Sequence, residues 1–599
     1  MSMSKRRPFE RPSAFKYSLA ALFSLLILIL LWMWVEIELF GITTETGMDK
    51  LRWIAIPTMI VALTFSAFWI TSSRRASARE QALLQQRQQL NQHQPTLAND
   101  LTRREYVLEV IGLGITVDKY RQTRLWEVLQ GGSPYASIRE QDPKKYEWSG
   151  FDKKGVGGGR ACDALENGAG PSPMFWGAPT FYAGSPIADP AQQPSDIDPV
   201  AGLAAAAPTT GMAWHLFVTA PWQLDERPDQ LLAQVFEFFD AHPDVPYVVL
   251  SSEDSMGTRD SDRPRGAPRL LRDGYYIPEM PDASAVFVLA RRERIEPMRS
   301  YAWEDPDNEF LQETLRRTYI ALEDSVPTPE KLAHPEKHSP IGRQPTVAEW
   351  LPIAAAFAKR PEFVRPEDGS PTLSSWKRWL HRPPRDWKPT PWFPVPWNRN
   401  QLAAFDRLPT LGYIHRPVFV KFEDEHGKAV TRRDQRQKIL DAGWQQALQT
   451  LPEAARTKGP ARIVGAFGDD PEQQLALEGV LFRYAEQGGP EIDTGKTAQF
   501  INTDRRLGNT GAATFFVQMA LGVMGSYNDG GTSAEINLRD KSGASIVFIS
   551  PPSDEKRKAQ GTQFRHQVEP AIDPKNYEAP AVEALLSAAS GTANASESR

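Results

Sequence analysis

Cysteine is nearly absent from this sequence, since Cys162 is the single cysteine among 599 residues. It cannot form an intramolecular disulfide, and large exported domains often contain such bonds. An excess of positive charge is also missing, because 69 Lys and Arg residues stand against 74 Asp and Glu residues. The basic residues are scattered, so the electrostatic footprint of a nucleic-acid-binding protein is absent. We therefore expect a protein without disulfides and with no nucleic-acid partner.

Long apolar runs are missing from residue 76 onward, but two of them precede it. Residues 17–34 and 53–70 are predominantly apolar and contain no charged side chain. A helix that crosses a bilayer core of about 30 Å needs about 20 such residues, so each run is close to spanning length. The sequence predicts a two-helix transmembrane hairpin within residues 1–75.

Charged residues around the two runs predict how the hairpin is oriented. Lys and Arg residues lie before the first run and after the second, whereas the segment between them is mainly acidic. Because basic residues next to membrane spans are retained in the cytoplasm, we expect both termini and the soluble body there. The alternative is a signal peptide followed by one anchor, which would export the body. It is disfavoured because the first run exceeds the apolar region of about 7–15 residues in signal peptides, and no cleavage site follows.

The remainder of the chain divides into segments by composition. Residues 76–94 lack Gly and Pro and are rich in helix formers, which predicts a helical stalk over 76–100. Strand and helix patterns alternate over 101–345 and again over 401–574, and this alternation predicts two α/β domains. Residues 575–599 are rich in Ala and Ser and predict a frayed tail.

Apolar periodicity places the elements of the two α/β domains. Gly112 and Gly114 suggest a tight exit from the first strand. In the first domain we expect strands at 106–111, 215–218, 247–250 and 285–290, and helices at 123–130, 228–241 and 307–322. In the second we expect strands at 418–422, 462–467, 534–538 and 545–549, and helices at 433–448, 471–487 and 510–524.

Residues 346–400 form a connector rich in Pro and Trp. Six prolines lie within 383–396, interleaved with Trp387, Trp392, Phe393 and Trp397. Proline fixes φ and removes a hydrogen-bond donor, so the segment is extended or rich in turns. It is either a connector packed across the domains or an arm that binds a partner. The packed connector is favoured because large aromatic side chains are seldom left in water.

Glycine-rich segments give no convincing phosphate site. Residues 489–497 resemble a phosphate loop, but five residues separate Gly489 from Gly495 where the motif has four, and a helix rather than a strand is expected before it. Residues 155–159 could hold an anion through backbone N–H groups, but a flexible surface loop is favoured. The pair Gly112 and Gly114 lacks the third glycine of a dinucleotide fingerprint.

No catalytic constellation can be assembled from the sequence. A Gly-x-Ser-x-Gly elbow is absent, and Ser251, Ser252 and Ser255 after the 247–250 strand fit a polar loop better than an active site. His334 and His338 are spaced for a helical metal pair, but Pro335 between them opposes a helix. Cys162 has no recognisable base partner. We therefore assign no catalytic, cofactor-binding or metal-binding residue, and no cofactor.

Four long stretches of the chain resemble the type VI secretion lipase adaptor family. They are the residues 108–150, 158–184, 242–255 and 273–294, which begin with LEVIGLGITV, GGRACDALEN, HPDVPYVVLS and DGYYIPEMPD. These blocks are typical of the family but contain no catalytic motif. The resemblance implies a bacterial, non-enzymatic adaptor that binds a phospholipase toxin effector and recruits it to the secretion spike. With the predicted hairpin, it implies a two-pass protein of the inner membrane whose body is cytoplasmic.

A weaker likeness links the chain to thiolase-type folds. VIGLGIT followed by LWEVLQGG is similar to the opening strand and helix of those enzymes, and residues 500–503 and 507–513 are similar to a late segment. The resemblance implies a duplicated α/β body. It also implies that the chemistry has been lost, because Asn509 stands where such enzymes have a catalytic histidine and no nucleophilic cysteine stands at the expected helix start.

Three functional hypotheses follow from these observations. The first is an adaptor that binds its effector through an apolar or aromatic patch rather than a charged groove, because interface centres favour Trp, Tyr, Met and Arg. The second is a membrane-tethered enzyme that processes acyl or lipid substrates, with Cys162, Ser252 or Ser255 as the residues to test. The third is a structural scaffold without cargo.

Overall fold

The computed structural model describes residues 107–303, 344–357 and 387–565, with short gaps at 175, 189–197, 211, 213–216, 226, 265, 394 and 469. The chain separates into two compact units, Met1–Thr102 and Arg103–Arg599, and all described residues belong to the second. Within those residues, no helix has the length and hydropathy needed to cross a membrane. The hairpin, the stalk, the helix expected at 307–322, the pair His334 and His338, and the tail at 575–599 lie outside the described residues.

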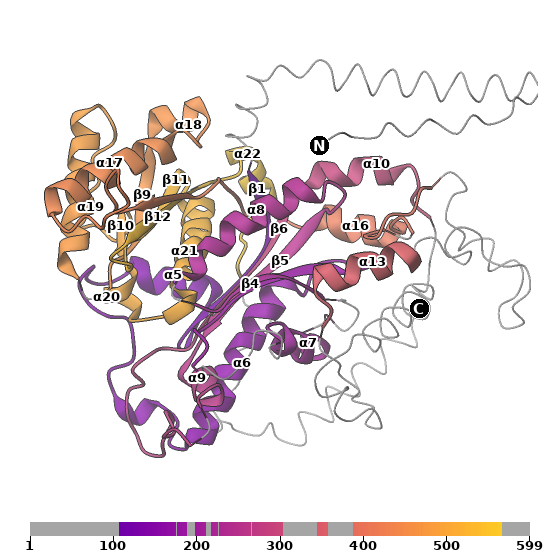
Figure 1. The fold of residues 1–599 in the computed structure, drawn as a ribbon, viewed down its shortest axis with the longest axis horizontal. Coiled ribbons are helices and arrows are strands. Elements are labelled where there is room, and N and C mark those ends of the chain that lie inside the picture. The colour runs from indigo at the N-terminus through magenta and orange to yellow at the C-terminus, as the bar shows by residue number, and fades with distance from the viewer. Residues whose placement is uncertain are drawn as a thin grey trace, which may run out of the picture. The chain divides into compact units, whose positions relative to one another are not determined.

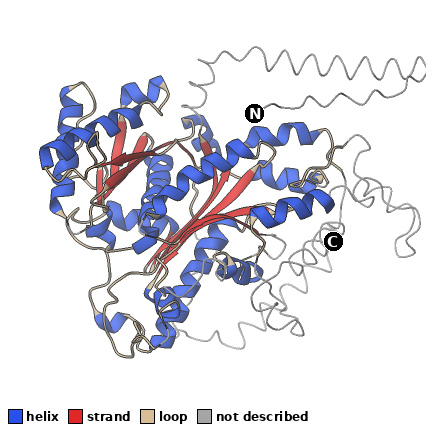
Figure 2. Ribbon diagram, in the orientation of Figure 1, coloured by secondary structure: helices blue, strands red, loops and turns tan. Residues whose placement is uncertain are grey.

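One mixed β-sheet of twelve strands runs through the described part of the body (Figures 1 and 2). The strand order is β10-β9-β11-β12-β7-β1-β6-β5-β3-β4, with β2 beside β1 and β8 beside β12. The pairs β3–β4, β3–β5, β9–β10 and β9–β11 are parallel, and the other pairs are antiparallel. The α/β class expected from the sequence is confirmed.

The strands and helices have the following bounds. The strands are β1 Leu108–Val117, β2 Tyr120–Arg121, β3 Ala178–Ala183, β4 Phe217–Gln223, β5 Tyr247–Asp254, β6 Ala283–Ala290, β7 Gly412–Ile414, β8 Val418–Lys421, β9 Pro460–Ala466, β10 Phe500–Asn502, β11 Thr532–Asn537 and β12 Gly543–Ser550. The α-helices are α5 Gln122–Gln130, α6 Gly150–Ala169, α7 Ala201–Ala206, α8 Leu231–Ala241, α9 Met256–Ser261, α10 Glu296–Arg299, α13 Val347–Phe357, α16 Arg399–Arg407, α17 Arg433–Leu448, α18 Glu453–Lys458, α19 Pro471–Glu486, α20 Thr503–Leu507, α21 Thr514–Asp529 and α22 Asp554–Gln560. The 3-10 turns are η2 Pro143–Lys145, η4 Ala207–Thr209, η5 Pro228–Gln230, η6 Arg292–Ile295 and η8 Gly511–Ala513.

Strand β7 joins the two sequence segments that were expected to form separate domains. It pairs with β1 through Leu108 and Ile414 on one side and with β12 through Ile414 and Ile549 on the other. The same hydrogen-bonded sheet therefore extends from the segment 101–345 into the segment 401–574. The domain boundaries themselves stay a prediction.

Two layers of helices enclose the sheet in the segment after residue 411. Side chains in a strand alternate between its faces. Val464 and Val547 pack in the same hydrophobic cluster as buried α21, whereas Ile463 and Phe548 pack in another cluster with α17 and α19. Helix α21 therefore covers one face, and the pair α17 and α19 covers the other.

Helix α6 corrects two expectations about glycine. Residues 155–159 are part of this helix and do not form a surface loop, and β1 continues through Gly112 and Gly114 instead of ending there. A Cβ at Gly112 would lie 2.1 Å from the Gly168 carbonyl oxygen, and one at Gly114 would lie 1.8 Å from the Ala164 carbonyl oxygen. The glycines thus allow the helix and the strand to pack backbone against backbone.

The described part of the Pro- and Trp-rich connector is packed, as favoured from the sequence. Trp392 and Trp397 are each 2 % exposed. Trp397 lies against Tyr247 and Phe405 with ring centroids 6.4 and 5.3 Å away, and the Trp392 indole contacts the His242 ring edge-on. This segment therefore forms part of the core of the body.

Candidate functional site

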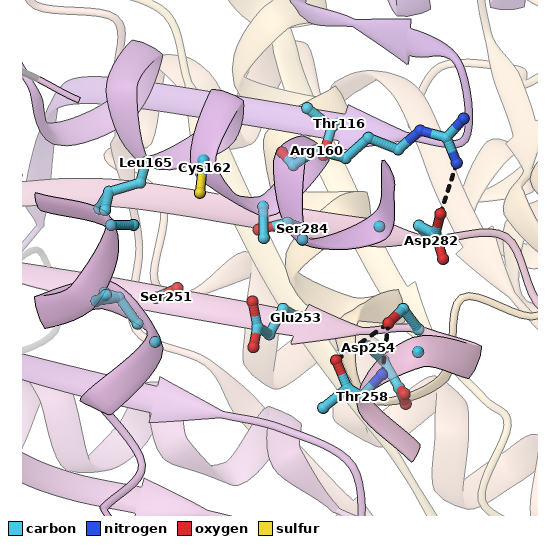
Figure 3. A pocket seen from close by; sticks show the side chains of 18 of the residues that line it. Thr116, Arg160, Cys162, Leu165, Ser251, Glu253, Asp254, Thr258, Asp282 and Ser284 are labelled. Atoms are coloured by element: carbon cyan, nitrogen blue, oxygen red, sulfur yellow. Dashed lines mark hydrogen bonds and ion pairs between the residues drawn. The ribbon is translucent and has the colours of Figure 1, made fainter. Parts of the chain in front are cut away.

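A cavity of about 440 Å³ lies beside β5 and β6 and is covered by helices α6, α7 and α9 (Figure 3). It brings together three residues considered from the sequence, which are Cys162 from α6, Ser251 from β5, and Ser255 between β5 and α9. Ser252 points to the opposite face of the sheet, where its hydroxyl donates to the Ala512 carbonyl at 3.5 Å. Strand β5 extends to Asp254, so the prediction of a polar loop after residue 250 was wrong.

Two carboxylates of the cavity wall are neutralised by arginine. Asp254 is fully buried, accepts two hydrogen bonds from Arg259 at 2.9 and 2.7 Å, and accepts a third from the Ala512 backbone N–H at 2.8 Å. Asp282 pairs with the Arg160 guanidinium at 2.5 Å. Burial nevertheless raises the pKa of Asp282, against the opposing effect of Arg160. These pairs give the cavity wall a fixed geometry.

Cys162 is not prepared for nucleophilic chemistry. Burial raises the pKa of its thiol, and the nearby Asp163 and Glu253 carboxylates raise it further. An active cysteine needs the opposite shift, because the thiolate is the nucleophile. The described lining of the cavity also contains no histidine. Among its serines, the Ser255 hydroxyl caps α9 by accepting the Thr258 N–H at 2.9 Å, which is a structural role.

A second cavity of about 550 Å³ lies at the start of α21 and contains Asn509. The Asn509 side-chain oxygen accepts hydrogen bonds from Arg539 at 2.6 Å and from the Gly511 backbone N–H at 2.9 Å. An amide cannot act as an acid or base near neutral pH. Asn509 therefore holds Arg539 in place at the position where the thiolase-type likeness would have a catalytic histidine.

A buried serine–histidine pair was not found from the sequence. His415 Nε2 lies 2.8 Å from the Ser550 hydroxyl, and Nδ1 lies 2.9 Å from the Thr450 carbonyl oxygen. The carbonyl can only accept, so Nδ1 carries the proton and Nε2 accepts from Ser550. Burial lowers the pKa of His415 to about 4, which makes it a weak base at neutral pH. The pair therefore serves to satisfy buried polar groups where β7 meets β12.

The segment that resembles a phosphate loop does not have the geometry of that motif in the described structure. The phosphate-loop-like residues 489–497 follow α19, as expected, and Lys496 pairs with Asp493 at 3.1 Å instead of standing free. No group of three or more His, Cys, Asp or Glu side chains within the described ranges could hold a metal ion.

An exposed group of large apolar side chains lies on the segments around the start of α6 and before β6. It consists of Trp148, Phe151, Leu270 and Tyr275, which are 53, 85, 43 and 52 % exposed, and we call it the aromatic surface. The backbone holds the two segments together, because the Gly274 N–H donates to the Trp148 carbonyl at 2.7 Å.

A buried lysine fixes the base of the aromatic surface. The Lys153 ammonium donates to the carbonyls of Trp148, Arg272 and Gly274 at 2.8, 3.1 and 2.9 Å. It also lies 4.5 Å from the centre of the Tyr276 ring. Asp273 contributes by accepting the Gly150 N–H at 2.9 Å. The aromatic side chains are thus exposed on an ordered support.

Two family models match the chain. The model for the N-terminal part of the type VI lipase adapter protein Tla3 matches residues 106–273, and the model for its C-terminal part matches residues 411–551. Together they cover more than half of the chain. The first match contains β1, the cavity wall formed by α6 and β5, and most of the aromatic surface, and the second contains α21 and the strands around it.

Several ketosynthase structures are also similar to the chain. A type II polyketide ketosynthase with its acyl-carrier protein (AntDE:AntF) is 9 % identical over 75 % of this chain and 100 % of its own, with a TM-score of 0.34. The first-module ketosynthase of bacillaene synthase from Bacillus amyloliquefaciens is 9 % identical over 76 % of this chain and 74 % of its own, with a TM-score of 0.35. The synthase FabH from Pseudomonas aeruginosa is 12 % identical over 75 % of this chain and 99 % of its own, with a TM-score of 0.31. Likenesses this weak carry no conclusion about chemistry.

Proposed function

The chain belongs to the type VI lipase adapter family, and from this premise we propose that it binds a phospholipase effector and brings it to the secretion spike. An adaptor role follows from the family itself. The phospholipase identity of the cargo and its transfer to spike components are our proposal. The observation that carries it is the aromatic surface, because a soluble body rarely exposes several large apolar side chains without a partner to cover them.

The aromatic surface has the chemistry of an interface centre. Trp and Tyr are enriched among the residues that dominate binding energy, and they are most effective when a partner excludes water from them. Phe151 is 85 % exposed in the first turn of α6, so truncating it removes little packing from the body. The hydrogen bonds of Lys153 to three carbonyls keep the support ordered before binding, which lowers the entropy cost of association.

The cavity supports the adaptor over the acyl- or lipid-processing enzyme. Hydrolysis or acyl transfer needs a nucleophile with a positioned base. Cys162 has a raised pKa, Ser255 caps a helix, and Ser252 faces the other side of the sheet. Turnover of a phospholipid or an acyl thioester that is lost in Cys162→Ala, Ser252→Ala or Ser255→Ala would favour the enzyme instead. A scaffold without cargo would be left if no stoichiometric partner were found.

The membrane tether completes the proposal. The apolar runs at 17–34 and 53–70 and their basic flanks support a two-pass anchor in the inner membrane with a cytoplasmic body. This position would let the adaptor meet its effector before secretion. A reporter enzyme that works only in the cytoplasm should be active when it is fused after residue 100. Activity of a reporter that works only in the periplasm would contradict this topology.

The central experiment is affinity purification of the full-length protein from solubilised membranes of its own host. We expect a phospholipase effector and a spike component to be recovered in stoichiometric amounts. The matched control is the double variant Trp148→Ser with Phe151→Ser, which should lose the effector while the body keeps its unfolding temperature within a few degrees. Recovery of no secretion component with the wild-type protein would refute the proposal.

A further inference from the structure

Polar side chains form a row across three strands on the floor of the cavity of about 440 Å³. In the antiparallel register, Thr116 of β1 lies opposite Ser284 of β6, and Ser284 lies opposite Glu253 of β5. Directly opposed residues in a sheet point to the same face. Ser251 is two residues from Glu253, so it shares this face. The register alone therefore brings Thr116, Ser284, Glu253 and Ser251 to one side of the sheet, below α6 (Figure 3).

Two members of this row have no partner in the protein. Ser251 and Ser284 are only 2 and 3 % exposed, and neither hydroxyl makes a hydrogen bond to any residue that the structure describes. Thr116 differs, because its hydroxyl donates to the Arg160 carbonyl at 3.0 Å. The two hydroxyl oxygens are not fully enclosed, so they are accessible from the cavity. Two adjacent hydroxyls on the cavity wall can therefore accept hydrogen bonds from a group that binds there.

Glu253 is the acidic member of the row. Burial raises the pKa of its carboxyl group, and a cation bound beside it would favour the charged form. One carboxylate oxygen accepts the Tyr182 hydroxyl at 3.0 Å, and the side chain remains partly exposed toward the cavity. The neighbouring acids are compensated, since Asp254 pairs with Arg259 and Asp282 with Arg160. Lys154 of α6 also lines the cavity, and its charge interacts with Asp262.

One part of the cavity wall is apolar. Leu165 of α6, Leu203 and Ala206 of α7, and Val286 of β6 line it. A ligand would therefore place a polar end on the sheet and a hydrocarbon part under the helices. The volume lies within the range of about 300–1,000 Å³ that is typical of small-molecule sites.

We propose that this cavity binds a primary alkylammonium group. An ammonium has three N–H donors and no acceptor. Glu253, Ser251 and Ser284 offer three acceptors on one face of the sheet, and a carboxylate is the strongest acceptor for a charged donor. The alkyl chain contacts the apolar side chains of α6 and α7. The group belongs either to a free alkylamine or to a lysine side chain of a partner protein, and both have the same chemistry.

The test uses n-butylamine as the ligand and 1-butanol as its uncharged counterpart. Binding to the full-length protein in detergent is measured by isothermal titration calorimetry at pH 7, where n-butylamine is protonated. We expect saturable binding of n-butylamine with one site per chain, and no binding of 1-butanol. Absence of n-butylamine binding to the wild-type protein would overturn the proposal.

Variants locate the binding to the polar row. Glu253→Gln keeps the size of the side chain and can still accept from Tyr182, so we expect a folded protein with at least about tenfold weaker n-butylamine binding. Glu237→Gln makes the same change on the exposed side of α8 and should bind like the wild type. If Glu253→Gln did not fold, Ser284→Ala would take its place, with a several-fold loss expected. Equal binding by wild type and both cavity variants would refute the proposal.

A competition experiment distinguishes the two sources of the ammonium. It rests on the proposed adaptor function, whereas the calorimetry does not. If a partner lysine occupies the cavity, saturating n-butylamine and the Glu253→Gln substitution should each weaken capture of the effector, while 1-butanol has no effect. If a free amine is the ligand, capture should be unchanged although n-butylamine binds. Failure of the adaptor proposal would leave the calorimetric result standing.

Discussion

The backbone of Gly114 in β1 lies directly against the carbonyl oxygen of Ala164 in α6, at a distance that leaves no space for a side chain. A Cβ at residue 114 would be 1.8 Å from that oxygen. Real Cβ atoms do not approach an oxygen this closely, and the neighbour is main chain rather than the flexible end of a side chain. The helix therefore could not keep its position over the sheet if residue 114 carried a side chain.

The first prediction is that Gly114→Ala strongly destabilises the body. Moving α6 away from β1 would disturb a large buried contact, and such overpacking costs about 3 kcal/mol. Urea unfolding followed by tryptophan fluorescence would measure the loss. Gly155→Ala is the matched control, because it lies in the same helix with no atom near its Cβ position. It should stabilise the protein by about 0.5–1 kcal/mol through helix propensity. Equal effects of the two substitutions would contradict this explanation.

The second prediction concerns Arg506, which ties the segment after residue 411 to the C-terminal end of α5. Its guanidinium donates to the Leu129 and Gly131 carbonyls at 3.1 and 2.9 Å and to the Ala136 carbonyl at 2.8 Å. Arg506→Met would leave these buried acceptors without a donor and should cost about 3 kcal/mol. Its exposed neighbour offers the control, since Arg505→Met should change stability by less than about 0.5 kcal/mol. A thermal unfolding temperature that is the same for both variants would argue against the role of Arg506.

The third prediction is a loss of stability in mild acid that depends on His415. Its ordinary pKa of 6.5 in the unfolded chain falls to about 4 in the folded protein, because burial disfavours the charged ring. The unfolded chain therefore binds the proton first, so stability decreases as the pH is lowered from 6.5 to 4 and this contribution is fully lost below 4. The effect is at most about 3 kcal/mol. In His415→Gln, the pH dependence of the free energy of unfolding should be flatter over this interval, and an unchanged slope would exclude His415 as its source.

The fourth prediction is that the thiol of Cys162 reacts slowly. The side chain is partly buried and its pKa is raised, so little thiolate is present at neutral pH. Iodoacetamide should modify the native protein several-fold more slowly than the urea-unfolded protein, as followed by mass spectrometry. The measurement is unambiguous because the sequence has one cysteine. Rapid modification of the native protein at pH 7 would instead favour the enzymatic hypothesis.

The fifth prediction tests the aromatic surface residue by residue. Phe151→Ala and Tyr275→Ala should each weaken effector binding by about tenfold or more, which corresponds to at least about 1.4 kcal/mol at an interface centre. Phe482→Ala is the control. This side chain is exposed too, at 66 %, but it lies on α19, away from the aromatic surface. If Phe482→Ala weakened binding as much as Phe151→Ala, the cargo would contact a different face.

Local patterns were sufficient for many elements of the body. The continuous apolar runs of β5 and β6 predicted buried strands, and the helix expected at 433–448 coincides with α17. Both signals depend only on residues that are close in sequence. Such signals predict the length and the type of an element, but they do not predict which other elements pack against it.

Helix α6 was missed because its sequence is locally unfavourable for a helix. Six glycines in its twenty residues lower its intrinsic helix propensity, and the close contact with β1 compensates for part of that cost. A local signal was present, since the Ser149 hydroxyl accepts the Asp152 N–H as an N-cap.

The cavity could not be predicted either, because it depends on contacts between distant parts of the sequence. Its polar row depends on the register of β1, β6 and β5, and register between distant strands is not visible in a single sequence.

The pairing of β1 with β7 sets the order in which the body can be completed on the ribosome. Leu108–Val110 of β1 finds its partner only at Gly412–Ile414, about three hundred residues later in synthesis. Until that segment emerges, the start of β1 has an open edge, and the apolar faces later covered by α21 remain uncovered. The nascent chain therefore has a long interval in which a chaperone, or early contact with the membrane surface, would protect it from aggregation. A fragment that stops between the two family-matched segments would stay in that exposed condition permanently, and biochemical work on this adaptor should use the whole body.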